Sequence, residues 1–167
     1  MKRGMMYLLF AVLLLLAAQA AFAANEITVT VTLQQVGVSV TPTSWALGKM
    51  APGTSQTSWV SGNPGYFTAT NDGNVAEDFT IAASSSAYWA PGLAVAIDTF
   101  VIGFGNAIDP YTSEPSYTTF TTATSFATSV PGGEDVRFDL NFTAPLVGST
   151  YDAGGETFTV SLAASVS

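Results

Sequence analysis

Apolar and polar residues alternate with a period of two over much of the chain, and this pattern predicts β-strands rather than helices. The first alternating run spans residues 27–33, and its apolar positions are Ile27, Val29, Val31 and Leu33. The phase then changes at Gln34-Gln35, because the next valines fall on even positions. A bulge or a change of sheet would absorb the extra residue. The pattern therefore predicts a strand over residues 27–33, followed by a bend.

The clearest local prediction is a β-hairpin near the middle of the chain. Residues 66–70 read as its first strand, and the sequence Asn-Asp-Gly-Asn at residues 71–74 reads as a tight turn. Residues 76–84 form the return strand, with Phe79, Ile81 and Ala83 on one face. Strand signals on both sides of a turn rich in Asn and Gly are typical of such hairpins.

Proline and glycine divide the remaining chain into further short segments. The segments that read as strands are residues 44–47, 56–60, 93–97, 100–104, 118–127, 136–142 and 158–164. Residues 93–97 and 100–104 are the most apolar of these, which predicts a central position. Residues 106–116 contain two prolines and two acids and predict a surface loop. In the strand of residues 136–142, Arg137, Asp139 and Asn141 fall on the face opposite the apolar side chains.

Eight to ten short strands with turn signals between them predict an all-β fold. We expect an antiparallel two-sheet sandwich, immunoglobulin-like or jelly-roll-like, that forms a single domain over residues 25–167. An N-terminal signal helix is expected to precede this domain.

The first 24 residues have the pattern of a signal peptide. Lys2 and Arg3 precede an apolar run over residues 5–18, and Ala21 and Ala23 supply small residues for cleavage. Gly4 leaves a prepilin-type signal as an alternative, in which the apolar helix is kept, and a plain membrane anchor is a third. Under all three the rest of the chain lies outside the cytoplasm, and it meets a membrane only through this segment if the segment is uncleaved.

Composition narrows the possible chemistry. The chain has no cysteine and no histidine, which removes thiol chemistry and the commonest general base and metal ligand. The acidic pairs at residues 77–78 and 134–135 are neighbours, and on a strand neighbours point to opposite faces. Without the signal, 2 cations remain against 12 acids, which disfavours binding to nucleic acid. We therefore expect neither an enzyme nor a nucleic-acid-binding protein.

Four groups of residues are candidate sites with simpler alternative explanations. Asp98, Asp109, Glu114 and Asp152 offer hard oxygen ligands for calcium, but they match no loop motif, and surface acids also maintain solubility. We predict no metal site. Asn141 begins a glycosylation sequon. The three tryptophans, Trp45, Trp59 and Trp89, either fill the core or form a face for sugars. Lys49 is a candidate for an isopeptide bond, although its neighbours predict a loop.

Two parts of the chain carry a resemblance to known families. The run from Asn71 to Thr80, with Pro131-Gly132-Gly133 and Ala144-Pro145, resembles immunoglobulin-like domains of secreted prokaryotic surface proteins. The combination of a signal peptide, one cysteine-free sandwich and a β-prone N-terminal strand is similar to TasA and camelysin-like matrix-fibre proteins and to archaeal bundling pilins. The resemblance implies that residues 27–33 of one subunit complete the sheet of a neighbour.

These observations predict a secreted structural subunit of an extracellular filament, matrix or surface coat at the cell exterior. Its partners would be copies of itself, joined through a donor strand that presents Ile27, Val29, Val31 and Leu33. The same four residues would otherwise belong to the first strand of the chain's own sandwich. The alternative function is an extracellular module that binds a glycan or another protein. No cofactor is expected apart from calcium, if the acids gather.

Overall fold

The computed structural model describes residues 30–59, 65–106, 114–146 and 155–167. The chain divides into two units, residues 1–33 and residues 34–167, and the second contains every described strand. The described residues form ten strands and no helix, which confirms the all-β prediction. The predicted signal helix lies outside the described residues, as do Ile27 and Val29.

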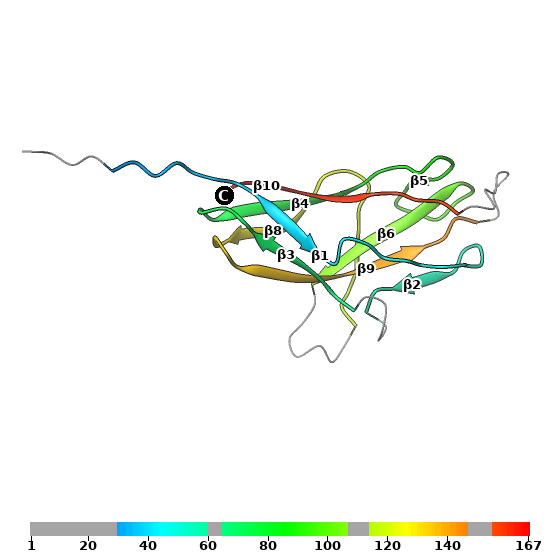
Figure 1. Ribbon diagram of the computed structural model, residues 1–167. Coiled ribbons are helices and arrows are strands. Elements are labelled where there is room, and N and C mark those ends of the chain that lie inside the picture. Colours follow the sequence, from blue (N-terminus) through cyan, green and yellow to red (C-terminus); the bar gives the residue numbers. More distant parts are fainter. Residues whose placement is uncertain (1–29, 60–64, 107–113, 147–154) are drawn as a thin grey trace, which may run out of the picture. The chain divides into compact units, whose positions relative to one another are not determined.

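The strands form two sheets (Figure 1). The larger sheet contains β1 (Val38–Thr41), β2 (Ser55–Thr57), β3 (Phe67–Asn71), β5 (Ala90–Pro91), β6 (Thr99–Asn106), β7 (Thr118–Thr119) and β9 (Asp135–Thr143). Its order is β1-β3-β9-β6-β5, with β2 paired to β9 and β7 paired to β6. The smaller sheet contains β4 (Glu77–Ala83), β8 (Thr124–Val130) and β10 (Val160–Val166), in the order β10-β4-β8. Pairing is antiparallel except between β5 and β6, which are parallel, so the prediction of a wholly antiparallel fold is wrong there.

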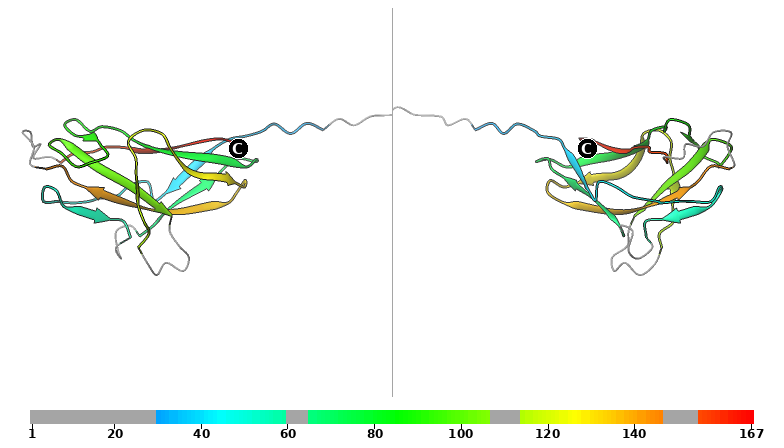
Figure 2. Two further views of the ribbon diagram at one scale, coloured as in Figure 1. Left: turned by 180° about the vertical axis from the view of Figure 1, so that it is seen from behind. Right: turned by 45° about the vertical axis from the view of Figure 1, so that its right-hand side comes forward.

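Phenylalanine dominates the core between the two sheets. Figure 2 shows β4 and β10 on one side of the unit and β2 and β9 on the other. Phe79 and Ile81 of β4 are fully buried, as the alternation predicted. The rings of Phe126 on β8 and Phe138 on β9 meet edge to face with their centroids 4.8 Å apart. Rings of this size remove a large apolar area from water, so contacts of this kind between the sheets stabilise the fold.

The predicted hairpin over residues 66–84 is wrong in its pairing. Its two strands form as β3 and β4, but β3 belongs to the larger sheet and β4 to the smaller one. Residues 72–76 therefore carry the chain from one sheet to the other. The buried Asn71 stabilises this crossing, because its side-chain amide donates to the carbonyls of Val75 and Val130 and its Oδ1 accepts from the amide of Gly73. An Asn-Gly turn thus forms, but without pairing the strands that flank it.

Two other predicted strands are absent from the described residues. Residues 44–47 have no strand assignment. Residues 93–97 form no strand, and Leu93 and Ile97 are 72% and 62% exposed. The reason is topological, since β5 and β6 are parallel and residues 92–98 must carry the chain back between them. The other apolar segments were predicted correctly and form β6, β9 and β10. Residues 118–127 form β7 and the first part of β8.

Candidate functional site

The predicted donor strand is described only from Thr30 onward. Residues 30–33 form no strand, so the alternative that this segment is the first strand of the chain's own sandwich is wrong for residues 30–33, whereas the donor strand stays a prediction. Val31 and Leu33 are 76% and 82% exposed, among the most exposed large apolar side chains of the described residues. Alternation produces a strand only where a neighbouring strand supplies hydrogen bonds, and the first such pairing starts at β1. Residues 30–33 therefore keep the composition of a strand without forming one.

The chain becomes anchored immediately after this segment. The carbonyl of Gln35 accepts from the amide of Asn74 at 3.1 Å, and the amide of Gln35 donates to Asn74 Oδ1 at 2.8 Å. Two residues later the amide of Gly37 donates to Glu77 Oε1 at 3.0 Å. Gln35 and Gly37 are thus bound to the crossing between β3 and β4. We call this hydrogen-bonded group the N-terminal anchor.

Glu77 is the central member of the N-terminal anchor. Its side chain is fully buried, and its second oxygen, Oε2, has no hydrogen-bond partner in the described part of the chain. A buried carboxylate is costly unless it is hydrogen-bonded, and the bond to Gly37 offsets part of that cost. Sequence analysis predicted Glu77 and Asp78 on opposite faces of a strand but did not predict the burial of Glu77 or its bond to Gly37. The neighbouring carboxylate behaves as predicted, since Asp78 is half-buried on the other face and accepts from the amide of Ser129.

The N-terminal anchor requires a glycine at position 73. A Cβ atom placed there would overlap Glu77 Oε1 and the carbonyl oxygen of Gln35, and would lie 3.0 Å from Asn71 Oδ1. Three oxygens therefore converge where a side chain would stand. Gly37 differs, because a Cβ atom there would make an ordinary contact of 3.7 Å with Asp72.

A cavity of about 1100 Å³ opens between the two sheets. Its lining combines apolar side chains of β9 and β10 with the segment that follows β1 (residues 42–50), and it also includes the charged Lys49 and Glu156. The residues that matter here are Trp45, Leu47, Phe138, Phe142, Val160 and Leu162. Protein interiors leave few voids larger than a water molecule, and this volume is at the upper end of typical ligand pockets. The cavity is large enough to receive another group.

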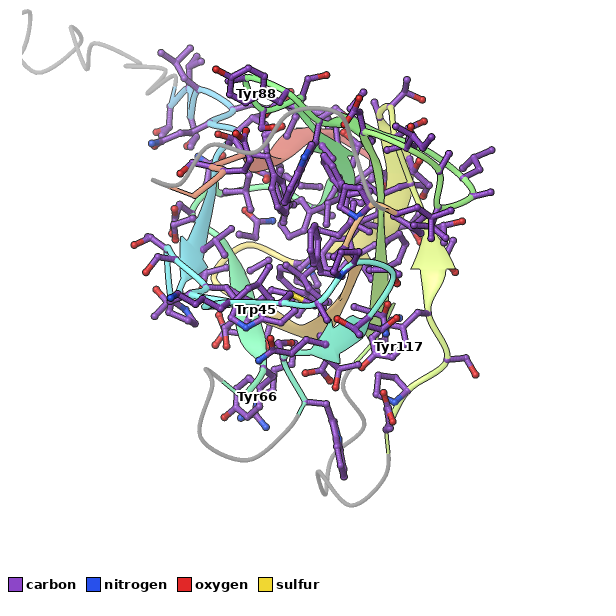
Figure 3. The ribbon with its side chains drawn as sticks, turned by 90° about the vertical axis from the view of Figure 1, so that its right-hand side faces the viewer. Trp45, Tyr66, Tyr88 and Tyr117 are labelled. Carbon is purple, nitrogen blue, oxygen red and sulfur yellow. The ribbon has the colours of Figure 1, made fainter. Side chains whose placement is uncertain are left out.

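The aromatic residues do not form one flat face. Trp45, Trp59 and Trp89 are all half-buried, and Trp45 and Trp89 pack against the core and line the cavity. Figure 3 shows Tyr66 and Tyr88 on opposite sides of the unit. The guanidinium of Arg137 lies over the ring of Tyr66, 4.8 Å from its centroid. The prediction that the tryptophans fill the core is therefore only partly correct, and the five residues do not share one sugar-stacking surface.

Two of the four acids considered for calcium lie in the described part of the chain. Asp109 and Asp152 lie outside the described residues, Glu114 is exposed and Asp98 is half-buried. The described residues contain no group of three or more acids able to hold a metal ion. Lys49 is exposed, as expected for a loop. Asn141 is half-buried on β9, between β2 and β6.

Asp139 was predicted on the face of its strand opposite the apolar side chains, but its burial was not predicted. It is fully buried, and its Oδ1 accepts a hydrogen bond of 3.2 Å from the buried hydroxyl of Ser58. Ser58 directly follows β2 and lies beside β9, because the amide of Ser58 donates to the carbonyl of Leu140 and the amide of Leu140 donates to the Ser58 hydroxyl. Burial, followed by the negative charges of Glu114 and Asp139, raises the pKa of the nearby Tyr117. The contact between Ser58 and Asp139 is therefore part of the fold, and the bases near it are carboxylates.

Sequence reasoning missed the residues that shape both features, the N-terminal anchor and the cavity. The sequence of residues 71–74 predicts a hairpin turn. Their role in the N-terminal anchor becomes visible only when Gln35 is seen paired with Asn74. A signal for the anchor was present in the phase change at Gln34-Gln35. No helix able to cross a membrane is found in the residues that the structure describes. No family model, no curated protein and no solved structure matches the chain.

Proposed function

We propose that the chain is an exported structural subunit that assembles with copies of itself into an extracellular filament, matrix or surface coat. We also propose that its two sheets form a sandwich of immunoglobulin-like type. The observation that carries the proposal is the exposure of Val31 and Leu33, at 76% and 82%, in a segment that forms no strand. Water disfavours exposed apolar side chains, and a partner that pairs with this segment would cover them.

The rest of the chain supports cohesion rather than catalysis as its role. Cysteine and histidine are missing from the sequence, and Glu77 and Asp139 bind groups of the fold itself. We propose that Ile27, Val29, Val31 and Leu33 are the side chains donated to a neighbour. Alternation gives all four the same face of an extended segment. The likeness to matrix-fibre proteins and bundling pilins belongs to this proposal.

Deleting residues 24–33 tests the proposal and leaves the N-terminal anchor at Gln35 intact. We expect the intact exported protein to form polymers at high concentration and the shortened protein to remain monomeric, by sedimentation velocity and negative-stain imaging. A synthetic peptide of residues 24–34 should raise the melting temperature of the shortened protein. Polymers of equal length from both proteins would contradict the proposal, as would an intact protein that stays monomeric at every concentration.

A second candidate function is an extracellular module that binds a glycan or another protein. The observation in its favour is that Trp45 and Trp89 both line the cavity. Sugar rings stack on such side chains, so binding should change tryptophan fluorescence. A protein that stays monomeric and whose fluorescence responds to oligosaccharides in a saturable way would favour this candidate over the subunit.

A further inference from the structure

The outer edge of β10 has backbone groups available for another strand. In the described residues β10 pairs only with β4, along its whole length. The carbonyl of Thr159 accepts from Ser84 and the amide of Ser167 donates to Ala76, so odd-numbered residues point their backbone groups toward β4. In an antiparallel ladder the alternate residues point the other way. The amides and carbonyls of Val160, Leu162, Ala164 and Val166 therefore face the open edge.

The same edge adjoins the cavity. Val160 and Leu162 line it, opposite Phe138 and Phe142 of the larger sheet. A strand added beside β10 would bind the outward-facing backbone groups, and every second side chain would point toward the larger sheet. The cavity of about 1100 Å³ provides room for those side chains.

Residues 27–33 have the composition that this edge and cavity require. Their four apolar side chains alternate with Thr28, Thr30 and Thr32, so one face would fill an apolar cavity while the other remains polar. The side chains of Val31 and Leu33 are 76% and 82% exposed. Glu26 is the only charged residue between the end of the predicted signal and Lys49, so no charge would be carried into the cavity.

The N-terminal anchor favours a second copy as the source of the strand. Gln35 and Gly37 continue the line of β1, since their carbonyls accept hydrogen bonds from the backbone amides of Asn74 and Asp72. The chain thus enters β1 at the crossing between β3 and β4, whereas the cavity is lined by residues that follow the other end of β1. To enter its own cavity, residues 27–33 would have to reverse direction with only Gln34 before the anchor, and a tight hairpin turn needs two residues. A segment from another molecule has no such constraint.

We infer that the open edge of β10 and the adjoining cavity accept residues Ile27–Leu33 of a second copy. Ile27, Val29, Val31 and Leu33 point into the cavity and the three threonines point away from it. This acceptor site rests on the proposed self-assembly and adds to it the surface that receives the donated strand.

Disulfide cross-linking tests the acceptor site directly, because the chain has no cysteine of its own. One tagged copy carries Val31→Cys, and a second copy with a different tag carries Val160→Cys, Leu162→Cys or Ala164→Cys. After mixing under polymerising conditions and mild oxidation, at least one of these three pairs should form a covalent dimer that carries both tags. Each matched control pairs side chains on opposite faces: Val31→Cys with Ser161→Cys or Ala163→Cys, and Thr30→Cys with Leu162→Cys. A disulfide needs Cα atoms about 4.4–6.8 Å apart and Cβ atoms that face each other, so we expect a yield lower by about tenfold for the controls.

Each outcome separates the acceptor site from self-assembly. Polymers that form normally, with equal cross-linking of the cavity-facing and control positions, would overturn the acceptor site and leave self-assembly standing. A protein that never polymerises would overturn the proposed function first. A chain with both Val31→Cys and Leu162→Cys that cross-links only within itself, independently of dilution, would show that the segment returns to its own cavity and would also overturn the inference. Circular dichroism of each variant confirms that it is folded.

Discussion

The N-terminal anchor predicts opposite effects for alanine at two nearby glycines. Gly73→Ala places a methyl group on the positions of Glu77 Oε1 and the carbonyl oxygen of Gln35. Forcing a group into an occupied site costs about 1–3 kcal/mol. Displacing residues 35–37 also weakens the bonds from Asn74 to Gln35 and from Gly37 to Glu77, at about 0.5–1.5 kcal/mol for the neutral bond and about 1.5–3 kcal/mol for the charged one. Partial relaxation leaves a loss of about 2–4 kcal/mol.

Gly37→Ala is the matched control. A Cβ atom at position 37 makes only an ordinary contact with Asp72, and neither glycine needs a positive φ. Alanine also restricts the unfolded chain, which stabilises a protein by about 0.4–1 kcal/mol at a compatible site. We therefore expect Gly37→Ala to leave stability unchanged or slightly higher.

Thermal unfolding followed by circular dichroism compares the two variants with the unmodified protein. For a domain of this size 1 kcal/mol corresponds to about 3–4 °C, so Gly73→Ala should lower the melting temperature by about 6–16 °C. Urea titration at constant m-value would confirm that the change is one of stability. Equal melting temperatures for Gly73→Ala and Gly37→Ala would refute the anchor as described.

Two further predictions concern the core and the buried tyrosine. Phe138→Ala removes a side chain that is 1% exposed and contacts the rings of Phe67 and Phe126. It should lower the unfolding free energy, measured by urea titration, by about 3–5 kcal/mol. The control Ser161→Ala, on the outer face of β10, should change stability little. Folding raises the pKa of Tyr117, so the stability that depends on its protonated hydroxyl is present below the unfolded pKa of about 10 and is lost as pH rises above it. Tyr117→Phe should therefore make the unfolding free energy fall less steeply above pH 10. An unchanged slope would contradict this prediction.

The sequence predicts the strands better than it predicts their partners. Alternation located β4, β9 and β10, because burial of one face imposes a period of two, and apolar composition located β6. Alternation alone contains no information about which strand lies alongside. The turn at residues 71–74 accordingly suggested a hairpin, whereas the Asn71 side chain stabilises a crossing between sheets. Residues 93–97 were placed at the centre for their apolar composition, but the parallel pairing of β5 and β6 makes them a connection.

The sequence allows a prediction of the donor segment of the proposed site but not of its acceptor surface. Residues 27–33 could be predicted as a donor strand because a local alternation marks them. The acceptor surface combines the edge of β10, the segment after β1 and the interior face of β9, which come from distant parts of the chain. Asp139 shows the same limit, since its buried contact is with Ser58, which directly follows β2 in a distant part of the chain. Such contacts depend on tertiary pairing, which the period of a single strand does not encode.

Sedimentation velocity of charged variants tests self-assembly through the N-terminal segment most directly. A protein with Val31→Asp and Leu33→Asp places two charges on the apolar face of the segment, and a matched protein with Thr30→Asp and Thr32→Asp carries the same charge on the other face. We predict that the unmodified and the threonine-substituted proteins sediment as polymers at high concentration, and that the first variant sediments as a folded monomer. Polymers from all three proteins, or from none, would contradict self-assembly through this segment.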